Sequence, residues 1–161
     1  ASKFSTTRTY IPAAGPDGKT GKPRDKRLDQ GVRMFRHDHL HHLSADPGAA
    51  VEWYKHVFDA KELERHDIRG GEAVRLDIGG VNIMVQQKQP DAEWAPAPAS
   101  PYHGLDHFCF RVDDIEAVGN LLKERGANIY DGPRSPRPGY GVIHLSGPDG
   151  VHVELIMRPE V

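Results

Sequence analysis

The chain has 161 residues, enough for one ordinary domain that buries about two-thirds of the surface of its unfolded form. Its 21 Lys and Arg are scattered among 23 Asp and Glu, for a net charge of -2, which argues against a nucleic-acid or membrane-surface partner. No apolar run approaches the roughly 18 residues of a membrane span, and the single cysteine, Cys109, excludes an internal disulfide framework.

The N-terminal sequence ASKFSTTRTY lacks the basic-then-apolar order of a signal peptide. We therefore expect a soluble, cytoplasmic protein. A signal peptide removed before Ala1 would instead place it in the periplasm.

Composition divides the chain into an arm and a domain. Residues 1–33 mix Gly, Pro and alternating charges without apolar periodicity, which predicts an irregular arm. Short apolar runs then follow one another, which predicts one domain over 34–161. A stretch rich in Pro and Ala, 88–104, predicts a linker inside it. The modules that the linker joins are 34–87 and 105–157.

The two modules repeat one another. The segment DHLHHLSADPGAAVEWYK from Asp38 aligns without gaps with DHFCFRVDDIEAVGNLLK from Asp106. The identical pairs are Asp38/Asp106, His39/His107, Asp46/Asp114, Ala49/Ala117 and Lys55/Lys123. The repeat predicts that both modules have the same secondary structure.

Each module is predicted to hold one strand, one helix and three more strands. Apolar alternation indicates the strands, Asp46 and Asp114 are the expected helix N-caps, and Gly-rich turns at 79–80 and 147–150 join the last strands. The predicted strands are 34–43, 61–66, 72–78 and 81–86 in the first module and 105–112, 127–130, 141–145 and 151–157 in the second. The helical faces that should pack inward are Val51, Tyr54 and Phe58, and Val118, Leu121 and Leu122. The expected fold is α+β, βαβββ twice.

Histidines and a glutamate fall at matching strand positions. Residues i and i+2 of a strand share a face, so His37, His39 and His41 should point one way, as should His107 and Cys109. A single strand histidine is more often a surface or hydrogen-bonded core residue than a ligand. The repetition of His39 as His107 favours a ligand, and a strand carboxylate such as Glu154 is costly to bury unpaired.

Two imidazoles and one carboxylate suit a divalent cation such as Fe²⁺, Mn²⁺, Ni²⁺, Co²⁺ or Zn²⁺ and leave positions open for substrate. We therefore expect a metal site formed by His39, His107 and Glu154.

The pairing of DHLHHLSAD and DHFCFRVDD with a closing GPDGVHVEL resembles the vicinal oxygen chelate superfamily, over 36–157. This superfamily includes glyoxalase I, methylmalonyl-CoA epimerase, extradiol dioxygenases, fosfomycin-resistance transferases and bleomycin-binding proteins. The resemblance implies two βαβββ modules that form an open, cup-shaped mixed sheet around a divalent metal. The family's ligand positions fall on His39, His107 and Glu154.

The chain departs from the family at the fourth ligand. Glyoxalase I and the epimerases have Glu or Gln there, and the alignment of GGVNIMV with DGVHVEL puts Met84 in that place. A thioether is a poor ligand for a hard cation. Gln86 is the alternative fourth ligand, and three protein ligands plus water is the preferred interpretation.

Two further histidines are candidate acid/base groups. His41 lies beside His39 on the same face, either as a catalytic or substrate-contacting residue or as a solvated histidine. His144 stands where the family places a Tyr before the GPDG turn, where an imidazole could move a proton.

The loop GPRSPRPGYG supplies candidate substrate-binding residues. Arg134 and Arg137 are either solvated charges or clamps for a carboxylate or phosphate, and Tyr140 accompanies them. A further His of the extradiol signature is missing from this loop, which lowers the weight of ring-cleaving chemistry. We expect His37, His42 and His56 to lie at the surface and Cys109 to serve packing.

The resemblance implies metal-dependent lyase or isomerase chemistry on a small oxygen-bearing substrate. One alternative is an extradiol-type Fe²⁺ dioxygenase, and another is a non-catalytic binding or resistance protein. The expected partner is a small molecule, without nucleic acid or membrane. The modules can pair within one chain or across a homodimer.

Overall fold

A computed structural model describes residues 35–160 of the chain. Asp38–Val161 forms one compact unit, to which the following description applies. The predicted arm over 1–33 lies outside the described residues. Within them, none of the helices combines the length and the apolar character needed to cross a bilayer.

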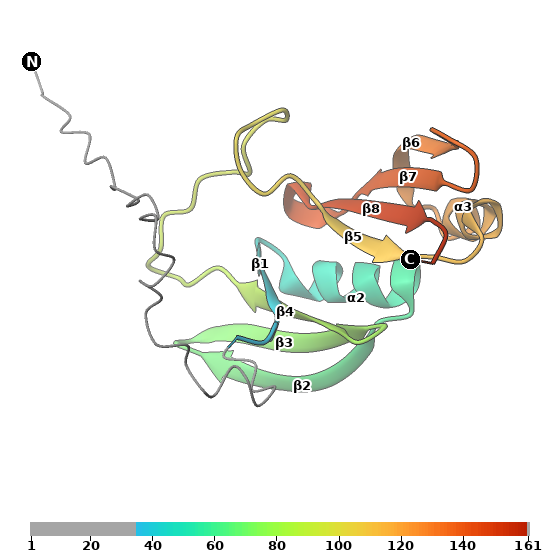
Figure 1. Ribbon diagram of the computed structural model, residues 1–161. Helices are drawn as coiled ribbons and strands as arrows, with labels where there is room; N and C mark the ends of the chain where they lie inside the picture. Colours follow the sequence, from blue (N-terminus) through green and yellow to red (C-terminus); the bar gives the residue numbers. More distant parts are fainter. Residues whose placement is uncertain (1–34, 161) are drawn as a thin grey trace, which may run out of the picture. The chain divides into compact units, whose positions relative to one another are not determined.

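The first module forms a four-stranded mixed sheet with one helix (Figure 1). The strand order is β1-β4-β3-β2, with β1 parallel to β4 and the other neighbours antiparallel. Its elements are β1 (Leu40–Ser44), α2 (Pro47–Phe58), β2 (Lys61–Ile68), β3 (Gly71–Ile78) and β4 (Val81–Gln87).

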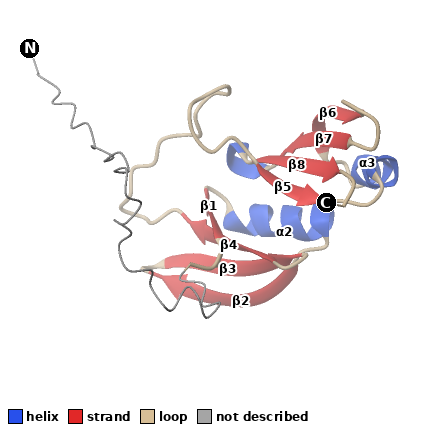
Figure 2. Cartoon of the chain, in the orientation of Figure 1, coloured by secondary structure: helices blue, strands red, loops and turns tan. Residues whose placement is uncertain are grey.

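The second module repeats this arrangement, with the strand order β5-β8-β7-β6 and β5 parallel to β8 (Figure 2). The predicted pair of βαβββ modules and the α+β fold class are thereby confirmed. The elements are β5 (Phe108–Arg111), α3 (Ile115–Glu124), β6 (Asn128–Arg134), β7 (Gly141–Ser146), the short 3-10 turn η1 (Pro148–Gly150) and β8 (His152–Met157).

Both predicted helix N-caps are confirmed. The side chain of Asp46 accepts a hydrogen bond from the backbone N–H of Ala49 at 2.9 Å. Asp114 accepts from the N–H groups of Glu116 and Ala117, both at 3.0 Å. Each carboxylate thus satisfies amide hydrogens that the first helical turn leaves unpaired.

Two details of the predicted elements are wrong. The first strand of each module begins later than expected, at Leu40 and at Phe108, so His39 and His107 lie just before the regular strands. Leu121 is 39% exposed, because the buried face of α3 follows the spacing of Ile115 and Leu122 and leaves Leu121 at its edge.

Helix α2 connects the cores of the two modules. Its Trp53 and Phe58 pack against the buried residues of both modules, and its Val57 belongs to the apolar cluster of the second. Phe108 and Phe110 of β5 also touch both clusters. In each sheet, the face that packs against the module's own apolar core therefore also faces the other module.

Hydrogen bonds and an ion pair of Arg125 connect the C-terminal end of α2 to the C-terminal end of α3. Arg125 donates to the carbonyl of Val57 at 2.9 Å and to both carboxylate oxygens of Asp59 at 3.0 and 2.9 Å. His56 faces the carbonyl of Arg125 at 3.0 Å. These bonds occupy carbonyl groups that a helix end leaves open.

A second polar contact between the modules is made by Asp149 in η1, whose carboxylate accepts three hydrogen bonds from the first module. Its partners are the Ser44 hydroxyl at 2.6 Å, the Ala45 backbone N–H at 3.1 Å and Nε2 of His42 at 3.1 Å. Nδ1 of His42 lies 3.2 Å from the Tyr54 hydroxyl. A neutral imidazole satisfies both contacts, donating to Asp149 and accepting from Tyr54.

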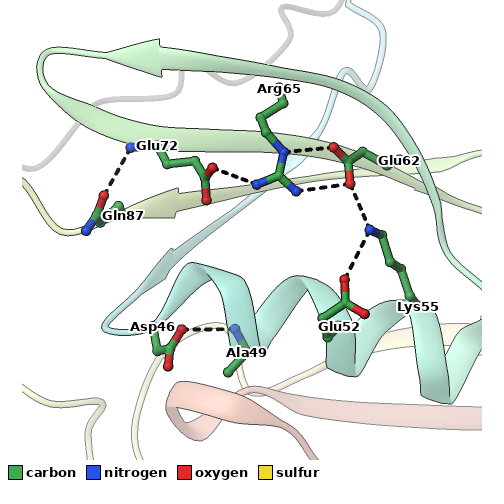
Figure 3. Close-up of polar contacts among 8 residues, drawn as sticks. All are labelled: Asp46, Ala49, Glu52, Lys55, Glu62, Arg65, Glu72 and Gln87. Atoms are coloured by element: carbon green, nitrogen blue, oxygen red, sulfur yellow. Dashed lines mark hydrogen bonds and ion pairs between the residues drawn. The ribbon is translucent and has the colours of Figure 1, made fainter.

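Edge strand β2 pairs with β3, and its exposed side chains add ion pairs rather than buried contacts (Figure 3). Lys55 of α2 pairs with Glu62 at 2.8 Å, and Arg65 pairs with Glu62 at 2.9 Å and with Glu72 at 2.6 Å. Exposed pairs contribute at most about 1 kcal/mol each. Charge along an exposed edge also discourages pairing with another strand.

The buried polar contact predicts how stability depends on pH. Burial lowers the pKa of His42, which Asp149 only partly opposes, so the folded protein resists protonation of this ring while the unfolded chain accepts a proton near pH 6.5. Burial would raise the pKa of Asp149, but bonds from Ser44, Ala45 and His42 outweigh it and lower this pKa. The free energy of unfolding should therefore fall as pH drops below about 6.5, and again below about 4.

Urea unfolding between pH 8 and pH 5 measures the first of these losses. His42→Phe should be less stable than the parent at pH 8, yet its stability should fall less on acidification, because the ring that must stay neutral is gone. The other titratable groups that act on His42, Asp149 and His41, are unchanged in the variant. Equal pH slopes for parent and variant would contradict the assignment.

Candidate metal centre

Each sheet has a second face, opposite the apolar clusters, which we call the open face. In the first module it carries His41 of β1, level with Met84 of β4. In the second it carries Cys109 of β5, level with Glu154 of β8. Since Cys109 matches His41 in the repeat, Met84 occupies the place of Glu154, which confirms the sequence alignment of the two strands.

Three predicted site residues meet on the open face of the second module. Nε2 of His107 lies 3.2 Å from Oε2 of Glu154, and Nε2 of His144 lies 3.8 Å from Oε1 of the same carboxylate. The rings of His107 and His144 are 5.8 Å apart, edge to face. The structure therefore brings together one of the two predicted histidine ligands, the carboxylate ligand and a predicted catalytic histidine.

The ring of His107 has a carboxylate at each nitrogen. Nδ1 lies 2.7 Å from Oδ2 of Asp106, and Nε2 faces Glu154. The hydrogen bond with Asp106 and the negative charge of Glu154 raise the pKa of this imidazole, against a lowering by partial burial. A carboxylate only accepts, so the space between Nε2 and Oε2 calls for a proton or a cation.

This geometry fits a shared cation. Two ligand atoms about 2.1 Å from one metal ion and at right angles to each other are about 3 Å apart. The donor set of imidazole nitrogen and carboxylate oxygen suits borderline divalent metals. His107 and Glu154 thus fit the metal that the sequence implied.

His39 lies with the first module. Its Nδ1 is 2.6 Å from Oδ2 of Asp38, and its ring is 5.6 Å from that of His41. Across residues 35–160, no three or more His, Cys, Asp or Glu side chains are arranged to hold a metal ion. Within a single chain, the structure does not bring the three predicted ligands together.

The predicted fourth ligand, Gln86, is buried beside His41. Its Oε1 lies 2.9 Å from Nε2 of His41, and its side chain belongs to the same open face as Met84. Gln86 therefore orients His41 in this structure. Its part in metal binding stays a prediction.

His144 is held by a residue that sequence reasoning missed. Nδ1 of His144 lies 3.2 Å from Oδ2 of Asp131, which also accepts from Nε of Arg134 at 2.7 Å. Tyr130 lies 5.9 Å from the ring of His144. The pairing is hidden in sequence because a bulge in β6 sets the facing residues.

The predicted substrate-binding residues lie on β6 and the loop after it. Arg134 pairs with Asp131, and the guanidinium of Arg137 stacks 3.7 Å over the ring of Tyr140. This contact holds Arg137 and Tyr140 as one unit. Their contact with substrate stays a prediction.

Two predictions about individual side chains are wrong. His42 is not a surface residue but only 7% exposed, because strand parity turns it to the core face, where Tyr54 and Asp149 bond both nitrogens. Cys109 is exposed rather than packed. Desolvation and the neighbouring Glu154 raise the pKa of its thiol to about 12, so it remains protonated.

A cavity of about 260 Å³ adjoins His107. Its walls combine apolar and aromatic side chains with imidazoles and carboxylates, without a Lys or Arg. Its lining residues are Leu40, His41, His42, Leu43, Tyr54, Ile83, Tyr102, Leu105, Asp106, His107, Phe108, Asp149, Gly150, Val151 and His152.

Solved structures with the same fold come from several bacteria. A glyoxylase/bleomycin resistance protein/dioxygenase domain from Frankia sp. EAN1pec has 20% identity and a TM-score of 0.64, covering 79% of this chain and 100% of that one. A glyoxalase family protein from Enterococcus faecalis has 20% identity and a TM-score of 0.64, covering 76% and 98%.

The fosfomycin resistance protein FosX from Listeria monocytogenes, in complex with Mn(II) and sulfate, has 13% identity and a TM-score of 0.58, covering 79% and 95%. At these identities the likeness concerns the fold alone.

A family model provides the sequence counterpart of this likeness. It matches residues 36–155, which include nearly all of both modules, the linker and all three predicted ligands. The chain belongs to the Glyoxalase/Bleomycin resistance protein/Dioxygenase superfamily.

Proposed function

We propose that the protein is a divalent-metal-dependent enzyme that performs lyase or isomerase chemistry on a small oxygen-bearing substrate. The observation that carries the proposal is the facing of His107 Nε2 and Glu154 Oε2 at 3.2 Å while Asp106 occupies Nδ1. With the ring proton on Nδ1, Nε2 and Oε2 are both acceptors, and at that distance they fit a shared cation. The members of the family that only bind their ligand usually lack such a set of side chains, which favours an enzyme.

The third ligand in this proposal is His39 of a second copy of the chain. Within one chain the modules contact each other through α2 and their core faces, and neither His39 nor His107 belongs to the apolar clusters of that contact. A second copy can cover them, pairing the first module of one chain with the second module of the other. The protein would then be a homodimer with two equivalent centres, as a two-fold interface requires.

The bound cation would polarise oxygen atoms of the substrate and stabilise negative charge that develops there. The residues of the chain supply the rest. His144, oriented by Asp131 and adjacent to Glu154, accepts or returns a proton through Nε2. His41, held by Gln86, is the second candidate for this role.

The cavity beside His107 suggests the kind of substrate. Its walls offer aromatic and aliphatic surface and two carboxylates, and the lining includes no Lys or Arg. A neutral carbonyl or hydroxyl compound with a short apolar part would be accommodated there. Arg134 and Arg137, which lie outside this lining, remain candidates for an anionic end of the substrate.

Metal content tests the centre directly. Protein purified without chelators, or equilibrated with Mn²⁺ and desalted, should retain the metal, as measured by inductively coupled plasma mass spectrometry. His107→Ala should lose the metal, because Glu154 and His39 of the second copy would be the only remaining ligands and would hold a cation weakly.

His103→Ala is the matched control, since it removes another exposed histidine from the linker and should leave the metal content unchanged. A parent protein that binds no divalent cation, or equal metal in parent and His107→Ala, would refute the proposed centre.

Mixing two inactive variants tests whether the centre is shared between copies. His39→Ala and His107→Ala should each fail to bind Mn²⁺. After subunit exchange, a mixed dimer combines an intact His39 with an intact His107 and Glu154, so binding should return at one of its two centres.

The measurement is Mn²⁺ binding before and after exchange, with each variant incubated alone as the control. If both ligands came from the same chain, mixing would restore nothing, and the shared centre would be excluded.

A further inference from the structure

The two candidate histidine ligands are each preceded by an aspartate in the same position. Nδ1 of His39 lies 2.6 Å from Oδ2 of Asp38, and Nδ1 of His107 lies 2.7 Å from Oδ2 of Asp106. Neighbouring side chains of a regular strand point to opposite faces, so such a contact cannot form inside one. It forms here because both pairs precede the first residue of their strand, Leu40 or Phe108.

This contact decides which ring nitrogen carries the proton. An ionised carboxylate has no hydrogen to donate, so an Nδ1 that contacts the aspartate donates to it, and at His107 this contact is shorter than the one between Nε2 and Glu154. In a neutral imidazole, Nε2 then carries the lone pair. For His107 that lone pair faces Glu154 at 3.2 Å, in the position where the proposed cation would lie.

Stability alone does not explain the two pairs. The side chains of Asp38 and Asp106 are 73% and 52% exposed, and contacts between exposed charged groups contribute little to folding. Yet this aspartate is one of the few residues identical in the two modules, together with the histidine that it contacts.

We propose that Asp38 and Asp106 are positioning residues, each fixing the tautomer and the ring orientation of the next histidine so that Nε2 is presented to the metal. The inference rests on the proposed function and deepens it. A carboxylate behind a ligating imidazole also increases the basicity of the nitrogen that binds the metal. The aspartates act through the histidines and need not touch the cation.

The test uses the full chain with Asp106→Ala, Asp106→Asn and, as matched control, Asp113→Ala, which removes an exposed carboxylate from the loop after β5. Mn²⁺ affinity is measured by isothermal titration calorimetry. Asp106→Ala should bind Mn²⁺ about 10- to 100-fold more weakly than the parent. Asp106→Asn, whose amide oxygen can still accept the hydrogen bond, should lose less, and Asp113→Ala should match the parent.

A second readout needs no metal. In the metal-free protein at a pH above the histidine pKa, ¹⁵N NMR distinguishes a protonated Nδ1 from a protonated Nε2, and comparison with His107→Ala assigns the signals. The parent should show Nδ1–H at His107, Asp106→Asn should retain it, and Asp106→Ala should shift toward Nε2–H. A structural role alone would not move this equilibrium.

The outcomes separate the two proposals. Loss of Mn²⁺ by His107→Ala together with unchanged affinity and tautomer in Asp106→Ala would overturn the positioning role and leave the proposed centre intact. Equal Mn²⁺ binding by the parent and His107→Ala would overturn both. Weaker binding by Asp106→Ala with the predicted tautomer shift supports the positioning role.

Discussion

The packing of α2 determines which faces of the two sheets remain open. Trp53 and Phe58 have large apolar surfaces, and they remove these surfaces from water by packing against the cores of both modules. In each sheet one face packs into this apolar contact. Because side chains alternate along a strand, His41 and Glu154 lie on the other face of their sheets. His39 stays with the first module and His107 with the second, and within residues 35–160 the two histidines and Glu154 form no metal-binding group.

The carboxylate of Asp149 provides a polar counterpart at the other end of the same contact. A buried imidazole is tolerated only if both nitrogens are satisfied, and His42 meets this condition through Tyr54 and Asp149. Asp149 lies in the turn that leads into β8, the strand of Glu154, while His42 lies in β1 beside His41. The contact therefore ties together the two strands from which proposed site residues arise.

Sequence periodicity and the internal repeat predicted most of the fold. They identified every strand, both helix caps at Asp46 and Asp114, and the equivalence of Met84 with Glu154, because these depend on local spacing. The burial of His42 was missed, since its partner Asp149 is 107 residues away and no local signal connects the two. Asp131 was missed for a similar reason, because a bulge in β6 decides which residue faces His144.

In the proposed centre, the charge balance around His107 favours a divalent cation over a proton alone. The ring lies between the carboxylates of Asp106 and Glu154. One proton on Nε2 adds a single positive charge between them, whereas a divalent cation adds two and also accepts the lone pair. The buried thioether of Met84 at the matching place in the first module adds no charge and little affinity for such a cation. In the proposed centre, this donor set would hold the metal and leave coordination positions for substrate oxygens.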